Sequence, residues 1–162
     1  MTKSYRIYMD LCCLNRPLDD SLQDRVRLET EAILSIYRKC RIGEWQLIGS
    51  EVIDLEIAQT KNIKRLEQLR LAISIAQEKC LLKNEIRYRV IELTQLGFKP
   101  FDAAHIASAE DIRVDVFLTT DDRLLKRANR YSDQLNVKVY NPVNWFISIN
   151  QPEGDENNDD TP

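Results

Sequence analysis

The sequence alternates short apolar segments with longer stretches of helical periodicity, and this alternation strongly limits its fold. Residues 5–9, 46–49, 114–118 and 137–140 are rich in aromatic and β-branched side chains, as strands are. Long segments separate them, and parallel strands need long connections that are usually helical. The pattern therefore predicts a three-layer α/β/α domain with a central parallel β-sheet.

Helical spacing is clearest between the first two strands, where apolar side chains recur three and four residues apart from Leu22 to Cys40. Ser50 stands where the N-cap of the next helix belongs. Pro100 stands at the first turn of another helix, a position that tolerates proline. The helices expected after the first cover residues 51–59, 63–76, 84–96, 101–111, 122–129 and 142–149.

Composition places the chain among soluble globular proteins. It has 162 residues, of which 43% are hydrophobic and 30% charged, enough for one domain. No apolar run reaches the roughly 18–20 residues that a membrane helix needs, and no secretory signal opens the chain. We therefore expect a cytoplasmic protein. Four cysteines without C-x-x-C spacing and a single histidine do not predict a structural zinc site.

The C-terminal segment differs from the rest of the chain. Residues 151–162 contain five acidic residues, no basic residue and almost no apolar side chain. Such a composition predicts a disordered tail following a folded domain at residues 1–150. Without these five acids the formal charge would be +2 instead of −3. The acidic total therefore does not argue against a nucleic-acid partner.

Four acidic residues, Asp10, Glu56, Asp102 and Asp121, fall near the expected carboxyl ends of the strands. Each also has an ordinary explanation. Asp10 could be a loop acid and Glu56 a solvated helix residue. Asp102 could favour the helix dipole, and Asp121 could be an N-cap. Together they gain weight, because ligands of parallel sheets bind at the carboxyl edge where the strand order reverses.

Carboxylates brought together at such an edge repel one another unless a cation lies between them. Oxygen ligands without histidine or cysteine suit Mg²⁺ or Mn²⁺, which also bind substrate phosphates. One or two such ions can activate a water molecule and stabilise the leaving oxygen of a phosphodiester. The four acids therefore predict metal-dependent phosphodiester hydrolysis.

Four segments in this order resemble the PIN-domain nucleases, in particular the bacterial, toxin-like members. The resemblance covers residues 5–146. The segments are Tyr8-Met9-Asp10-Leu11, Ser50-Glu51-Val52-Ile53-Asp54-Leu55-Glu56, Pro100-Phe101-Asp102-Ala103-Ala104-His105-Ile106-Ala107-Ser108-Ala109 and Phe117-Leu118-Thr119-Thr120-Asp121-Asp122-Arg123-Leu124-Leu125. The last two are the most specific, and their acids lie 19 residues apart, which is typical of the family.

The resemblance implies that Asp10, Glu56, Asp102 and Asp121 bind Mg²⁺ or Mn²⁺ and carry out catalysis, with Thr119 as a supporting hydroxyl. It implies an endoribonuclease acting on single-stranded RNA. In many members it also implies a homodimer and the role of a toxin restrained by an antitoxin protein. Residues 12–17 depart from the commonest toxin pattern, so the toxin role stays open.

A one-turn shift would exchange some of these acids for their neighbours. Glu51 and Asp54 compete with Glu56 for the helix position, and Asp122 competes with Asp121. His105 lies one turn after Asp102, and we interpret it as a packed or surface residue in preference to a catalytic one.

Basic residues near these acids are candidates for RNA contacts. After Asp121, four of them recur on one helix face: Arg123, Lys126, Arg127 and Arg130. They form either a phosphate-binding ridge or a solvated helix face. Arg16 follows the first strand and could contact phosphate or hold its own loop.

Other enzyme classes lack their signatures. The position two residues after Asp10 is Cys12, where an aspartyl phosphatase needs a second Asp, and no phosphate-loop or dinucleotide-binding glycine motif is present. The main alternative is a non-catalytic PIN-like module that binds RNA or protein. The presence of all four expected acids argues against a decayed site.

Overall fold

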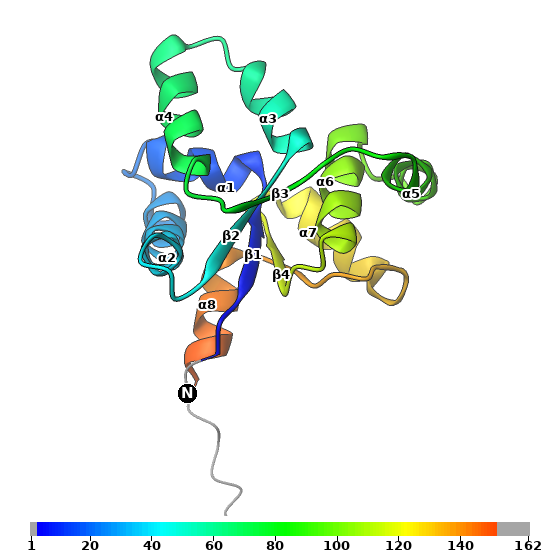
Figure 1. Cartoon of the computed structure of the whole chain (residues 1–162). Coiled ribbons are helices and arrows are strands. Elements are labelled where there is room, and N and C mark those ends of the chain that lie inside the picture. The colour runs from blue at the N-terminus through cyan, green and yellow to red at the C-terminus, as the bar shows by residue number, and fades with distance from the viewer. Residues whose placement is uncertain (1–2, 152–162) are drawn as a thin grey trace, which may run out of the picture.

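Five parallel strands form a single sheet in the computed structural model, which describes residues 3–151 (Figure 1). The strand order is β3-β2-β1-β4-β5, and every neighbouring pair is parallel. The strands are β1 (Arg6–Met9), β2 (Gln46–Ser50), β3 (Glu78–Cys80), β4 (Val116–Leu118) and β5 (Val139–Tyr140). The α/β class and parallel sheet expected from the sequence are confirmed. The expected acidic tail, apart from Gln151, lies outside the described residues.

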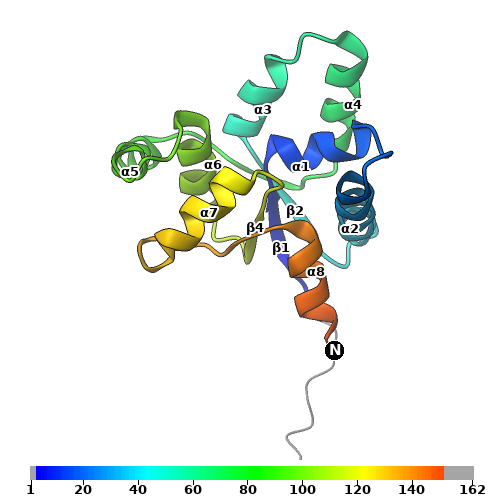
Figure 2. The same ribbon diagram turned by 180° about the vertical axis from the view of Figure 1, so that it is seen from behind.

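Helices connect the strands and cover both faces of the sheet (Figures 1 and 2). Helices α2, α4 and α8 lie on one side, and α5, α6 and α7 lie on the other. None of the helices between residues 3 and 151 combines the length and apolarity that a membrane crossing needs. The helices are α1 (Leu11–Asn15), α2 (Asp24–Arg41), α3 (Glu51–Ala58), α4 (Ile63–Ile73), α5 (Asn84–Gln95), α6 (Pro100–Asp111), α7 (Asp122–Arg130) and α8 (Pro142–Asn150), with short 3-10 helices η1 (Arg16–Leu18) and η2 (Ser132–Gln134).

The central strand β1 forms the middle of the core. Ile7, Tyr8 and Met9 are fully buried, as are Phe117 and Leu118 on the neighbouring strand β4. Strands covered by helices on both faces lose contact with water on both sides, which explains their nearly continuous apolar sequence. Burial of these side chains fixes where β1 and β4 end, and therefore where the residues that follow them are placed.

Two elements were not predicted from the sequence. Helix α1 and strand β3 lie in segments to which the sequence pattern assigned no helix or strand. Helix α1 has five residues, too few to show helical periodicity, and it begins because the Asp10 side chain caps it. Strand β3 has three residues at the sheet edge, and two of them, Glu78 and Lys79, are exposed and charged. Charged edge residues oppose further strand pairing and hide the strand signal.

The order in which strands are added to the sheet reverses at β1. Strands β2 and β3 are added on one side of β1, and β4 and β5 on the other. The carboxyl ends of β1 and β4 therefore flank the point where loops leave in opposite directions, which is where ligands of open α/β sheets bind. Asp10 follows β1, and Thr119 follows β4.

Candidate active site at the carboxyl edge of the sheet

Asp10 is buried directly after β1, with 3% of its surface exposed. Its Oδ1 accepts a hydrogen bond from the Cys13 amide at 3.1 Å and so caps α1. Burial raises the pKa of its carboxyl group to about 6, although the Thr119 hydroxyl, His105 and the Cys13 amide act in the opposite direction. The fold therefore keeps a carboxylate in a poorly solvated position without an ion-pair partner from Lys or Arg among residues 3–151.

Asp102 lies in the first turn of α6, as predicted, and is half-buried. Burial raises the pKa of its carboxyl group, and the negative charges of Asp121 and Glu56 raise it further. His105 and Lys99 lower this pKa, but the net shift is upward. The mutual repulsion shows that these carboxylates, which come from three helices, lie within electrostatic range of one another.

Asp121 serves as the N-cap of α7. Its Oδ1 accepts hydrogen bonds from the amides of Arg123 at 2.9 Å and Leu124 at 3.3 Å. Its own amide donates to the Oγ1 of the fully buried Thr119 at 3.1 Å. Both capping bonds use Oδ1, so the cap does not require Oδ2. The capping role and a ligand role are therefore compatible in the same side chain.

Glu56 is on α3, with 23% of its side chain exposed. Its Oε1 lies 3.0 Å from Nε2 of His105, which is 1% exposed. On the same helix Val52, one turn earlier, is buried, whereas the adjacent Leu55 is exposed, so Glu56 lies at the margin of the packed face. The structure thus joins Glu56 to His105, which the sequence suggested was a packed or surface residue. The signal that could have revealed this is the spacing of His105, one turn after Asp102.

The thiol of Cys12 lies within electrostatic range of all four acids. Burial raises its pKa to about 12, and four negative charges act in the same direction. Those charges belong to Asp10, Asp121, Glu56 and Asp102, in decreasing order of effect. Cys12 is at the surface, beside the cluster, whereas the other three cysteines are buried. Residues from four separate segments therefore converge at the carboxyl edge of the sheet.

The carboxylates are near one another without forming a preformed coordination shell. Among residues 3–151, no group of three or more His, Cys, Asp or Glu side chains stands in an arrangement that would hold a metal ion as it is. The chemistry of the donors nonetheless suits a hard divalent cation, because the buried Asp10 and the mutually repelling Asp102 and Asp121 are groups that a cation would relieve.

The competing acids have other partners. Glu51 accepts a hydrogen bond from the Leu82 amide at 2.9 Å. Asp54 pairs with Lys79 at 2.6 Å. Asp122 accepts two hydrogen bonds from Arg25, each of 2.7 Å. These three side chains bond to partners outside the cluster of four acids.

The basic candidates divide into two groups. Arg16 is held by Asp19 and Glu29, each at 3.2 Å, so it secures its own loop. Arg127 donates to the Leu96 carbonyl at 3.0 Å, and Arg130 lies over the Tyr131 ring at 5.4 Å. Arg123 and Lys126 are exposed in the first two turns of α7. Sequence analysis did not select Arg25, which ties α2 to the start of α7 through Asp122 and the Thr120 carbonyl.

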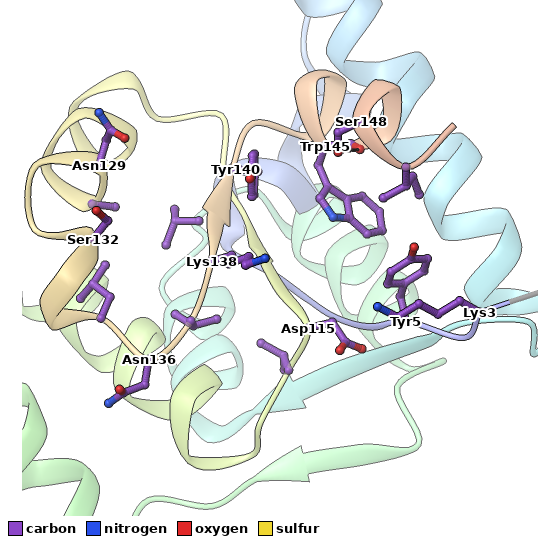
Figure 3. Close-up of a pocket in the computed structure, with 16 residues that line it drawn as sticks. Lys3, Tyr5, Asp115, Asn129, Ser132, Asn136, Lys138, Tyr140, Trp145 and Ser148 are labelled. Atoms are coloured by element: carbon purple, nitrogen blue, oxygen red, sulfur yellow. Dashed lines mark hydrogen bonds between the residues drawn. The ribbon is translucent and has the colours of Figure 1, made fainter. Parts of the chain in front are cut away.

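A sizeable cavity lies elsewhere. It has a volume of about 960 Å³ and is lined by sixteen residues, none of which is one of the four acids (Figure 3). Tyr5, Asp115 and Trp145 belong to its wall, on the side of the sheet where β1 and β4 begin. Size alone does not make it the reactive site, because the perturbed carboxylates are at the other end of these strands.

Comparison with known proteins adds no family assignment. No family model matches the sequence, and no curated protein matches it either. The five-stranded parallel sheet with order 3-2-1-4-5 is compatible with both PIN-like and Rossmann-like folds.

Proposed function

We propose that this chain is a PIN-like, metal-dependent endoribonuclease that hydrolyses phosphodiester bonds in single-stranded RNA. The observation that carries the proposal is the convergence of Asp10, Glu56, Asp102 and Asp121 around Cys12, at the point where the strand order reverses. Four carboxylates from four segments are hard to explain by stability, because their repulsion and desolvation oppose folding.

The four carboxylates would hold Mg²⁺ or Mn²⁺, with water and phosphate oxygens completing the coordination. When bound, such an ion lowers the pKa of water and neutralises charge on the phosphate. Asp10 would supply a ligand fixed by its capping bond to Cys13. Thr119 orients the start of α7 through the Asp121 amide, so it would set the direction of that carboxylate.

Arg123 and Lys126 would bind phosphate groups of the RNA backbone. Both are exposed on the helix that Asp121 caps, so they lie beside the carboxylates. Phosphate contacts of this kind give affinity without reading the base sequence. A toxin role under the control of an antitoxin protein, and a homodimer, belong to this proposal through the resemblance to bacterial PIN proteins alone.

The test is cleavage of structured and unstructured RNA in Mn²⁺, Mg²⁺ or EDTA, with Asp102→Asn measured in parallel. Cleavage that needs the metal and is lost in Asp102→Asn supports the proposal. No cleavage together with no metal-dependent stabilisation contradicts it.

A second candidate is a non-catalytic PIN-like module that binds RNA or a protein. The absence of a preformed ligand group among residues 3–151 favours it. The two functions differ in their response to metal, since a non-catalytic module gains no stability from Mn²⁺.

A further inference from the structure

A line of three hydrogen bonds connects Glu56 to the interior of the sheet. Glu56 Oε1 is 3.0 Å from His105 Nε2, and His105 Nδ1 is 2.6 Å from Tyr8 Oη. Tyr8 Oη is 2.7 Å from Ser50 Oγ, which also accepts from the Ile53 amide at 3.0 Å. The line therefore joins α3, α6, β1 and the end of β2.

When the His105 ring is neutral, the chemistry of the four groups gives this line one direction. An ionised carboxylate only accepts, so His105 Nε2 carries the proton that reaches Glu56. Nδ1 of a neutral ring then accepts, and the Tyr8 hydroxyl donates to it. The single hydroxyl proton of Tyr8 goes to Nδ1, so the Ser50 hydroxyl donates to Tyr8 while its oxygen accepts from the Ile53 amide. Burial raises the pKa of Tyr8 well above its ordinary value, which keeps the phenol protonated and able to donate.

The inner part of this line is buried, and its outer end reaches the surface. Tyr8 and Ser50 are fully buried, and His105 is 1% exposed. The Tyr8 ring stacks on Phe117, with centroids 5.2 Å apart and planes 12° from parallel. Only Glu56 reaches the surface, beside the other acids. A side chain held at one oxygen in this way presents its other oxygen in a fixed direction.

We propose that His105 is a positioning residue for Glu56: it holds Oε1 and leaves Oε2 as the oxygen available to a divalent cation. Tyr8 and Ser50 fix the tautomer and orientation of the His105 ring. Carboxylates that bind metals are commonly oriented by a hydrogen bond of this kind, whose loss weakens metal affinity about 10–100-fold. This inference rests on the proposed function, because it assigns His105 to the same metal site.

If this polar network served only the stability of the fold, substitutions in it would have a different effect. It would tolerate any substitution that keeps the core packed, and its loss would change folding without changing metal binding in the folded protein. The test must therefore measure metal affinity in variants that are shown to be folded.

The test uses the full chain and measures Mn²⁺ binding by isothermal titration calorimetry. His105→Asn shortens the side chain, so it keeps an amide near the Nδ1 position but no longer reaches Glu56. His105→Gln keeps a donor near the Nε2 position. We expect His105→Asn to weaken Mn²⁺ binding about 10-fold or more, and His105→Gln to retain most of the affinity. Equal binding by the wild type and His105→Asn overturns the inference.

A double-mutant cycle decides whether His105 acts through Glu56. In a Glu56→Ala background, His105→Asn should cause no further loss of Mn²⁺ affinity, because the oriented oxygen is already gone. If the losses of Mn²⁺ affinity from Glu56→Ala and His105→Asn add in full in the double variant, the positioning role is overturned. Circular dichroism and thermal unfolding identify the variants that are folded.

If His105→Asn does not fold, the same measurement is made on Tyr8→Phe. It removes one hydroxyl and leaves the ring stacked on Phe117, and we expect Mn²⁺ affinity to fall several-fold, about the lower end of the range above. Tyr140→Phe, on β5, is the matched control and should bind Mn²⁺ like the wild type. An unchanged affinity in Tyr8→Phe counts against the inference.

Failure of this inference and failure of the proposed function can be told apart. Wild-type protein that binds no Mn²⁺ contradicts the metal site, and the role of His105 falls with it. Wild-type protein that binds Mn²⁺ and cleaves RNA, beside a folded His105→Asn variant with the same affinity, leaves the function standing and removes only the positioning role.

Discussion

The amide of Asp10 donates a hydrogen bond to the carbonyl oxygen of Leu118 at 3.2 Å. This bond extends the β1–β4 pairing by one step beyond the strands. It fixes Asp10 against the residues that lead to Thr119 and Asp121, although they are more than a hundred positions later in the chain. The first acid is thus placed by the sheet itself, and its substitution should report on the chemistry of the site without disturbing the backbone.

Asp10→Asn should stabilise the metal-free protein at neutral pH. The folded-state pKa of Asp10 is about 6, above its ordinary value of 3.8, so its contribution is fully favourable below pH 4 and is lost as the pH rises through 6. At pH 8 the variant should be more stable by about 2–3 kcal/mol, because Asn carries no buried charge. Urea unfolding in EDTA at pH 4, 6 and 8 measures this difference. A gain that does not grow with pH would contradict it.

Asp121→Asn and Asp122→Asn should behave differently although the residues are adjacent. Asn is a good N-cap, so Asp121→Asn should fold normally but lose metal-dependent stabilisation. Asp122→Asn loses an exposed ion pair with Arg25 but should keep the metal-dependent stabilisation. For a metal at 100 times its Kd this stabilisation is about 2.7 kcal/mol. Thermal unfolding with and without Mn²⁺ provides the comparison, and an equal response in both variants would mean that Asp121 is not a ligand.

Glu29→Gln should destabilise the fold by about 2 kcal/mol. Glu29 is 2% exposed and accepts a hydrogen bond from Asn141 at 2.6 Å, and it lies 3.2 Å from Arg16 and 3.3 Å from Arg25. Gln removes the buried negative charge that Arg16 and Arg25 share, and each then keeps only its more exposed partner, Asp19 or Asp122. Glu31→Gln, at an exposed position of the same helix, is the control and should change the free energy of unfolding little. Chemical unfolding that gave equal values for both variants would rule out a structural role for Glu29.

Gly97→Ala should cost more stability than Gly43→Ala. Both glycines have positive φ, +93° and +85°, so alanine is strained at each by about 1 kcal/mol. A methyl group at Gly97 would also stand 2.4 Å from the Arg127 guanidinium, whereas at Gly43 it would meet nothing within 4 Å. Arg127 would then lose its bond to the Leu96 carbonyl. Urea unfolding of the two variants measures the difference. Similar losses of unfolding free energy would show that the Arg127 side chain moves aside without cost.

Periodicity in the sequence predicted most of the fold because strands and long helices carry a repeated apolar signal. It placed four of the five strands to within two residues at each end, and it identified Ser50 as an N-cap, which accepts from the Ile53 amide. It missed α1 and β3, which are too short to show a period and depend on the Asp10 cap and on pairing with β2. Those contacts arise only when the chain is folded.

The candidate site was predictable where it follows from strand ends and less so where it depends on packing. Asp10 and Asp121 follow strands, so the parallel sheet alone brings them together. The pairing of Glu56 with His105 joins residues 49 positions apart and requires α3 to pack against α6. The position of Cys12 among the acids follows from α1, which the sequence did not reveal. No local pattern encodes contacts of this kind.

The pairing of β1 with β4 also determines when the site can exist during synthesis. Asp10 is made early, but its neighbour across the sheet belongs to a strand that ends at Leu118. A nascent chain that has emerged only as far as α5 holds two of the four acids and none of β4. Loop closure over such a distance is a late and slow step in folding. An incomplete polypeptide therefore lacks the complete set of acids, and the proposed activity toward RNA would begin only once almost the whole domain has left the ribosome.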